Sequence, residues 1–256
     1  MTTVLYQIPG DVARGPLGAT ELERRRALLQ DWAAEGTIVE VADAPGGPPS
    51  IESHLEEALC IAPMLAAVQS RRTRPDAIVV GCFGDPGLAA LRQAFDCPVV
   101  GPLEASFHLG AQLGARVGIV TVVDGVVPLI DGLVRGMGLS LRYAGALAID
   151  VPVLELRARE ALVADRVVEA ARRLVVRHGA DVLLLGCMSL AFLGLAERAA
   201  QACGVPVVNP ARCALKTAEA LVSQRLVQSR RTYPKPGKPV APPEPADEPE
   251  PSRREP

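Results

Sequence analysis

A short apolar run that ends in Gly-Cys occurs twice in this chain of 256 residues, once in each half. The first copy, Asp76–Cys82, reads DAIVVGC, and the second, Asp181–Cys187, reads DVLLLGC. Each run is too short for a helix and is rich in aliphatic side chains, which predicts a buried strand. A helix-like segment and a second apolar run follow each copy, PVVGP at Pro98–Pro102 and PVVNP at Pro206–Pro210. The repeat therefore predicts two similar α/β units, each with a cysteine at the end of a strand.

Strands and helices are predicted to alternate along the chain as far as residue 224. The predicted strands are 4–8, 37–41, 78–80, 99–100, 116–122, 141–149, 183–185 and 205–208, and the predicted helices are 20–34, 50–68, 104–113, 126–136, 160–178, 190–202 and 213–224, with a further helix after Asp85-Pro86-Gly87. Thr20, with Glu23 as a capping-box partner, and Ser50 are the predicted N-caps of the first two helices. Pro86 suits the first turn of the helix that follows Cys82, and Asp85 is interpreted as a helix cap.

Alternation of this kind implies parallel sheets built from right-handed βαβ units. We expect residues 1–101 together with 206–228 to form the first lobe and residues 102–205 to form the second. Residues 229–256 hold nine of the 23 prolines, mixed with Lys, Arg and Glu, and predict a disordered tail. Ligands of open parallel sheets bind beyond the carboxyl ends of the strands, which is where Cys82 and Cys187 are expected.

Composition limits the class of protein. The chain is 49% hydrophobic, and its net charge of −2 favours neither nucleic acid nor an anionic membrane as a partner. No apolar run approaches the roughly 20 residues of a membrane span, and the N-terminus lacks the pattern of a signal peptide. Six cysteines without a Cys-x-x-Cys pair indicate free thiols in a reducing cytoplasm, and three scattered histidines predict no metal site. Neither a P-loop nor a Gly-x-Gly-x-x-Gly pattern is present, so we expect no cofactor.

Cys82 and Cys187 are the candidate catalytic residues. Each is expected between a strand and a helix, where backbone N–H groups would lower the thiol pKa and could hold a carboxylate or an enolate oxygen. Two thiols on opposite sides of a carbon acid can invert its stereocentre, since one removes a proton and the other returns a proton to the opposite face. A single buried cysteine is usually a packing residue, but a pair at equivalent strand ends favours function. The other four cysteines, interpreted as packing residues, are Cys60, Cys97, Cys203 and Cys213.

Seven segments together carry a resemblance to a known family: SIESHLEEA (50–58), GCFGDPGL (81–88), EASFH (104–108), VGIVT (117–121), AIDVPVLEL (148–156), LLGCMSLA (184–191) and VPVVNP (205–210). Over roughly residues 50–222 the chain resembles the hydantoin and allantoin racemases of the aspartate/glutamate racemase superfamily, which use no pyridoxal phosphate. The resemblance implies an α/β fold of two pseudo-symmetric lobes, each a short, mostly parallel sheet flanked by helices, with the active site in the cleft between them. It also implies that Cys82 and Cys187 are the acid/base thiols of a racemase or epimerase, acting on a hydantoin-like ureide or an amino-acid derivative.

The same resemblance implies the substrate contacts. Thr121 and the backbone at Phe83, Gly84, Met188 and Ser189 would contact the polar atoms of the substrate. Hydantoin racemases carry Asn-Pro-Asn-Thr near the N-terminus, where this chain reads Ile8-Pro9-Gly10-Asp11, so that only Pro9 matches and Gln7 or Asp11 would substitute. Val122 stands where a second threonine is usual. These changes lie where the substrate is expected to be chosen.

Alternative functions follow from the same residues. Maleate cis–trans isomerases resemble this superfamily and use two cysteines, one of them as a nucleophile, whereas arylmalonate decarboxylases need only the second cysteine. A non-catalytic small-molecule-binding protein is a third reading, supported by the altered N-terminal segment. His54 and His108 are interpreted as structural residues rather than as catalytic ones. The expected partner is a small molecule, and the chain is free to form a homo-oligomer.

Overall fold

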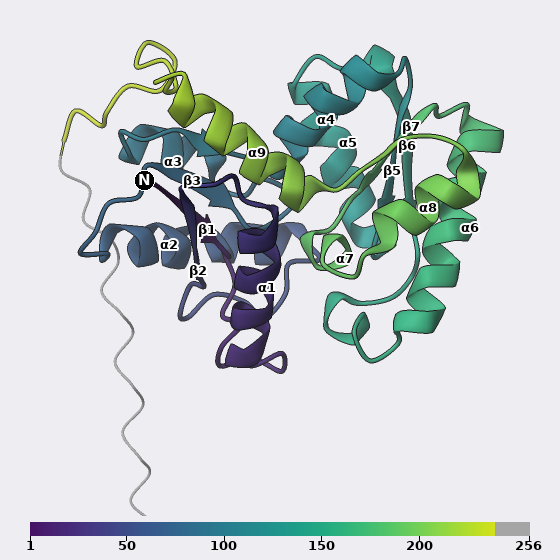
Figure 1. Ribbon diagram of the computed structural model, residues 1–256, viewed down its shortest axis with the longest axis horizontal. Helices are drawn as coiled ribbons and strands as arrows, with labels where there is room; N and C mark the ends of the chain where they lie inside the picture. Colours follow the sequence, from purple (N-terminus) through teal and green to yellow (C-terminus); the bar gives the residue numbers. More distant parts are fainter. Residues whose placement is uncertain (239–256) are drawn as a thin grey trace, which may run out of the picture.

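Each half of the chain forms its own four-stranded parallel sheet in the computed structural model, which describes residues 1–238 (Figure 1). The strand order is β2-β1-β3-β4 in the first sheet and β6-β5-β7-β8 in the second. The two orders coincide when β5 to β8 are matched with β1 to β4, and every strand pair is parallel. The expected fold of two pseudo-symmetric α/β lobes is therefore confirmed.

The order of elements follows the predicted alternation. The strands are β1 Thr2–Gln7, β2 Thr37–Ala42, β3 Ala77–Val80, β4 Val99–Val100, β5 Val117–Thr121, β6 Tyr143–Ala148, β7 Val182–Leu185 and β8 Val207–Val208. The helices are α1 Ala19–Trp32, α2 His54–Gln69, α3 Leu88–Ala94, α4 Pro102–Leu113, α5 Val127–Gly136, α6 Glu160–His178, α7 Met188–Ala191, α8 Leu195–Cys203 and α9 Pro210–Ser223, with 3₁₀ turns at Asp124–Val126, Ser140–Arg142 and Val153–Glu155. All residues of β3 and β7 are buried, which explains why these central strands read as unbroken apolar runs.

Two helices begin elsewhere than their predicted caps. The helix α1 has no side-chain cap, and Thr20 lies inside it. Ser53 rather than Ser50 caps α2: its side chain accepts a hydrogen bond from the Glu56 N–H, and the Glu56 carboxylate accepts one from the Ser53 hydroxyl. The Glu56 carboxylate also accepts a hydrogen bond from the Glu52 N–H at 2.7 Å, so Ser53 and Glu56 together hold the start of α2. Ser50 takes no part because its hydroxyl donates to Glu52 in the preceding loop.

Asp85 is a helix cap, but of α4 rather than of the helix that follows it in sequence. Its two carboxylate oxygens accept hydrogen bonds from the backbone N–H groups of Leu103 and Glu104, each at 2.9 Å. The helix α3 begins only at Leu88, so Pro86 precedes the helix instead of lying in its first turn. Because α4 packs against β7, Asp85 ties the loop after Cys82 to the second lobe.

The chain crosses back to the first lobe after β8. The strand β8 pairs with β7 and thus belongs to the second sheet, so the predicted boundary at residue 206 falls too early. The helix α9 then packs against β1 and β3 of the first sheet (Figure 1). The predicted single helix 190–202 is α7 and α8, which are separated where Gly194 adopts a left-handed conformation with φ of 66°.

The segment after α9 folds against α3 rather than being disordered from residue 229. The side-chain amide of Gln228 donates to three backbone carbonyls at the end of α3 and just beyond it. Arg230 and Lys235 both reach the Asp96 carboxylate, at 2.7 and 2.9 Å. These donors occupy carbonyl groups that a helix end leaves without partners, which holds residues 228–235 in place. The rest of the predicted tail, 239–256, lies outside the described residues.

Among the helices of the described residues, none is both long enough and apolar enough to cross a membrane.

Candidate active site

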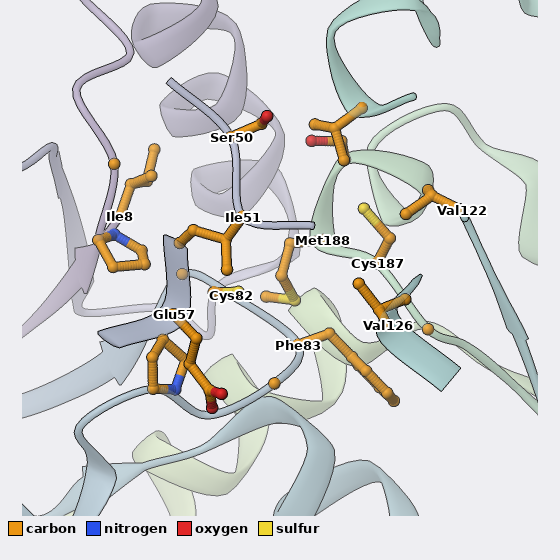
Figure 2. A pocket seen from close by; sticks show the side chains of 18 of the residues that line it. Ile8, Ser50, Ile51, Glu57, Cys82, Phe83, Val122, Val126, Cys187 and Met188 are labelled. Atoms are coloured by element: carbon orange, nitrogen blue, oxygen red, sulfur yellow. The ribbon is translucent and has the colours of Figure 1, made fainter. Parts of the chain in front are cut away.

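The carboxyl ends of the two sheets open into one cavity of about 90 Å³ between the lobes (Figure 2). The first lobe contributes the segments after β1 and β3, and the second contributes the end of β5 and the segment after β7. The loop before α2 adds Pro49, Ser50 and Ile51. The cavity thus lies where ligands of open parallel sheets bind, and both Gly-Cys copies line it.

Cys82 comes from the first lobe and Cys187 from the second, both line this cavity, and Met188 lies between them in the view of Figure 2. Ile51 and Val122 line the same cavity. Both cysteines are free and partly accessible, and none of the other four cysteines lines the cavity. Burial is the main cause that raises the pKa of Cys82, and a charge on Cys187 adds to this rise.

A glycine precedes each cysteine because the neighbouring strand leaves no room for a side chain. Gly81 donates its N–H to the Gln7 carbonyl at 2.7 Å, and a Cβ on Gly81 would lie 2.9 Å from Ile8 Cα. Gly186 donates to the Val120 carbonyl at 2.6 Å, and its Cβ would lie 3.0 Å from that same oxygen. Each glycine continues the ladder between two central strands past the strand end. The repeated motif therefore delivers both thiols from equivalent places.

Burial raises the pKa of both thiols, which reverses the expected direction. For Cys82 the loss of water outweighs the backbone N–H of Gly84, and for Cys187 it outweighs the N–H groups of Leu190 and Ser189 and the charge of Arg25. The expected lowering by a helix N-terminus is wrong because α3 begins well after Cys82 and α7 has only four residues. Although each cysteine keeps some surface open to the cavity, protein atoms surround its sulfur, and a thiolate there lacks most of its hydration.

Alkylation of the two thiols by iodoacetamide is expected to be slow at pH 7 and to rise with pH. A raised pKa leaves less thiolate at neutral pH, and the rate grows about tenfold per pH unit below the pKa. Cys187 should react at a lower pH than Cys82, because only Cys187 has the charge of Arg25 among the causes that lower its pKa. Mass spectrometry of the two peptides between pH 6 and 10 measures both profiles. A plateau below pH 8 for both peptides would contradict the effect of burial.

Six of the predicted substrate contacts line the cavity: Pro9, Phe83, Gly84, Thr121, Met188 and Ser189. The hydroxyl of Thr121 donates to the Gly186 carbonyl at 3.1 Å, so this residue also holds the segment that carries Cys187. The backbone at Phe83, Gly84, Met188 and Ser189 follows the two cysteines directly, as the sequence led us to expect.

Gln7 and Asp11 do not line the cavity, so neither substitutes there for the polar residues of the family segment. Gln7 is fully buried, and its amide donates to the carbonyls of Ile8 and Asp43 instead. The Asp11 carboxylate accepts hydrogen bonds from backbone N–H groups of its own loop and of Gly46. The wall of the cavity that follows β1 is therefore apolar, with Ile8, Val12 and Leu17.

Comparison with known proteins decides the family. A sequence model described as Asp/Glu/Hydantoin racemase matches residues 19–218. The chain belongs to the Asp/Glu/hydantoin racemase family. It is 33% identical to a hydantoin racemase of Paenarthrobacter aurescens over 81% of this chain and 88% of that protein, and 33% identical to one of Rhizobium meliloti over 77% and 82%. An allantoin racemase structure from Pseudomonas fluorescens matches with a TM-score of 0.87 and 28% identity, over 94% of this chain and 99% of that one. The resemblance stated from sequence is confirmed, and the protein is a racemase, hence an isomerase.

The two charged residues that line the cavity of this racemase, Arg25 and Glu57, were not among the predicted contacts. Glu57 lies on α2 next to His54, and burial raises its pKa. The segment Ser50–Ala58 was part of the family resemblance, which is a signal that could have pointed to Glu57. Arg25 lies on α1, outside every quoted segment, and no sequence pattern pointed to it. His108 is exposed, does not line the cavity, and places its Nδ1 2.7 Å from the Glu104 carbonyl.

Proposed function

We propose that this racemase inverts a carbon-acid stereocentre without a cofactor, with Cys82 and Cys187 as its two acid/base groups. The observation that supports the proposal is that thiols from equivalent strand ends of opposite lobes line one cavity. A planar carbanion or enolate between them would present one face to each sulfur. Inversion needs proton donors on both faces, and a pair of side chains from two lobes supplies them.

The proton balance closes within the site. One thiolate removes the proton from the stereocentre, so that a C–H bond breaks, an S–H bond forms, and the electron pair moves onto the adjacent carbonyl as an enolate. The opposite thiol then gives its proton to the other face of the carbon and becomes the thiolate. Burial raises the pKa of both thiols, and a thiolate of raised pKa is a stronger base, which suits a weakly acidic C–H.

The proposed substrate is a hydantoin-like ureide or an amino-acid derivative. Named relatives that act on hydantoin and allantoin support this class. We further infer that the substituent on the stereocentre is apolar, because aliphatic side chains dominate the lining of the cavity. These are Ile8, Val12, Leu17, Ile51, Val122, Val126, Leu129, Ile130 and Val153.

Hydrogen–deuterium exchange in D₂O tests this function. The protein, with no pyridoxal phosphate added, is incubated with single enantiomers of 5-substituted hydantoins, allantoin, N-carbamoyl amino acids and free amino acids. We expect deuterium at the stereocentre together with appearance of the other enantiomer for at least one of these compounds. Samples without enzyme, and with the Cys82→Ala/Cys187→Ala double variant, measure the spontaneous rate. If no compound exchanges above that rate, the proposed function is wrong.

A further inference from the structure

Arg25 brings a guanidinium to the cavity wall that also carries Cys187 and Ser189. It lines the cavity, although only 3% of the residue is exposed. Its Nη2 donates to the Ser189 hydroxyl at 3.0 Å, and its Nε donates to the Glu21 carboxylate at 2.8 Å. The ring of Phe192 lies against it, with the centroid 5.2 Å from Cζ. These contacts fix the position of the guanidinium and leave it little freedom to move away from the site.

The positive charge of Arg25 is only partly neutralised by the protein. Three arginines share the single carboxylate of Glu21: Arg24 at 2.8 Å, Arg25 at 2.8 Å and Arg157 at 3.0 Å. Burial favours the neutral form of Glu21, but Arg24 and Arg25 together lower its pKa to about 2, so it is ionised at neutral pH. The cluster of three arginines and one glutamate therefore carries a net positive charge. Within the described residues, Nη1 of Arg25 donates to no acceptor, which leaves two N–H bonds for a ligand.

No other side chain in the neighbouring part of the cavity wall could bind an anionic group of a ligand in place of Arg25. The segment after β1 presents Ile8, Val12 and Leu17, while the side chains of Gln7 and Asp11 are engaged elsewhere. The other charged residue of the lining, Glu57, is an acid and cannot serve as a cation. A buried cation beside an apolar cavity is costly unless an anion pairs with it.

We propose that Arg25 binds a carboxylate of the substrate, and that this racemase prefers acyclic amino-acid derivatives with a free carboxylate and an apolar side chain over neutral hydantoin rings. The inference rests on the proposed function, because it names the substrate class of the same two-thiol site. The free N–H bonds of the guanidinium can form charge-assisted hydrogen bonds to a carboxylate, which are stronger than bonds between neutral groups. Removal of the α-proton places a second negative charge on that carboxylate, and a fixed cation stabilises this charge as it develops.

A matched pair of probes tests the preference. N-carbamoylleucine and 5-(2-methylpropyl)hydantoin share one side chain, but only the first carries a carboxylate. We expect wild-type kcat/KM for α-deuteration to be higher for N-carbamoylleucine. Arg25→Met should lower kcat/KM for N-carbamoylleucine by roughly 10- to 100-fold more than for the hydantoin, because loss of the charge beside Cys187 affects both probes but loss of the carboxylate contact affects only one. Arg25→Lys should restore part of the loss, since the charge remains but the fork geometry does not. Arg157→Met is the control, because Arg157 contacts Glu21 but does not line the cavity.

If Arg25→Met lowers kcat/KM equally for both probes, the assignment is wrong, because Arg25 would then act by stabilising the fold or by positioning the thiols. A binding measurement separates this outcome from failure of the proposed function. Titration calorimetry with 4-methylpentanoate, a carboxylate of similar shape, should show binding to wild type that Arg25→Met loses, with unchanged melting of the variant. If Arg25→Met loses binding but the wild type deuterates none of the probes, the carboxylate site is supported and the proposed function is refuted. If wild type and Arg25→Met bind 4-methylpentanoate equally well, the carboxylate site is refuted.

Discussion

Replacing either Cys82 or Cys187 with alanine is expected to lower the rate of racemisation by about 10²- to 10⁴-fold, the usual contribution of one general acid or base. Both thiols line the same cavity from opposite lobes, so neither can take over the face that the other serves. The rate is measured by the appearance of the opposite enantiomer from a substrate identified by exchange in D₂O.

The two single variants should differ from each other in a way that only a two-sided site produces. With Cys82 removed, Cys187 can still take a proton from the one enantiomer whose C–H bond faces it and return a deuteron to that same face. With Cys187 removed, Cys82 should act on the other enantiomer. Each variant is therefore expected to deuterate one enantiomer with retention, and the preferred enantiomer should switch between the variants.

Cys97→Ala and Cys203→Ala are the matched controls. These cysteines also form a repeated pair near the second apolar run of each half, but neither lines the cavity. Both controls should racemise at the wild-type rate. Wild-type turnover in both Cys82→Ala and Cys187→Ala would exclude the two-thiol mechanism, and the same enantiomer preference in both would place the thiols on one face.

The two-lobe fold and the pairing of Cys82 with Cys187 could be predicted because both depend on local patterns. A central strand of a parallel sheet is buried on both faces, so β3 and β7 appear in the sequence as short apolar runs that need no knowledge of the rest of the fold. The carboxyl ends of the strands form the ligand-binding edge of each sheet, so cysteines that end equivalent strands of the two sheets are expected at one shared site.

Features that depend on packing between distant segments could not be predicted. Glu21 and Arg25 are spaced like an exposed i,i+4 pair on a helix, and only the packing of α1 beside Ser189 and Phe192 turns them into a buried charge at the site. The ordered packing of residues 228–235 against α3 could not be predicted, because the proline-rich composition of the sequence from residue 229 onward indicates disorder. The prediction that both thiol pKa values are lowered was wrong for a related reason. A helix start can be inferred from the sequence, but the burial that raises both pKa values is a property of the folded chain.

Gly81→Ala and Gly186→Ala are each expected to destabilise the protein by about 1–3 kcal/mol, the cost of inserting a methyl group where no space exists. At Gly81 the new Cβ would lie 2.9 Å from Ile8 Cα and 3.0 Å from the Gln7 carbonyl oxygen, so the backbone of β1 has to shift. At Gly186 it would lie 2.7 Å from Ile119 Cγ2 and 3.0 Å from the Val120 carbonyl oxygen. Urea unfolding measures the loss of stability, and Gly81→Ala should be the more damaging because the new Cβ would crowd the backbone Cα of Ile8.

Gly132→Ala is the matched control for both variants. Gly132 lies in α5, is exposed, and has no atom within 4 Å of the position that a Cβ would take. Alanine there removes the flexibility of glycine in a helix and should stabilise the protein by about 0.5–1 kcal/mol. Replacing glycine with alanine is thus expected to lower stability at residues 81 and 186 and to raise it at residue 132. This difference separates the effect of crowding from any general effect of alanine.

The two glycine variants should also lose activity beyond what their stability explains. Each glycine is bonded to the neighbouring central strand immediately before a thiol, so a shift of the backbone there moves the sulfur relative to the substrate. A misplacement of about 1 Å can cost about 10²-fold in rate. Measured under conditions where the variants remain folded, Gly81→Ala should slow the steps that use Cys82, and Gly186→Ala those that use Cys187, so the two should favour opposite enantiomers, as the cysteine variants do. If both variants fold with wild-type stability and show no such bias, the close approach of the strands is not what places the thiols, and the repeated Gly-Cys pattern would need another cause.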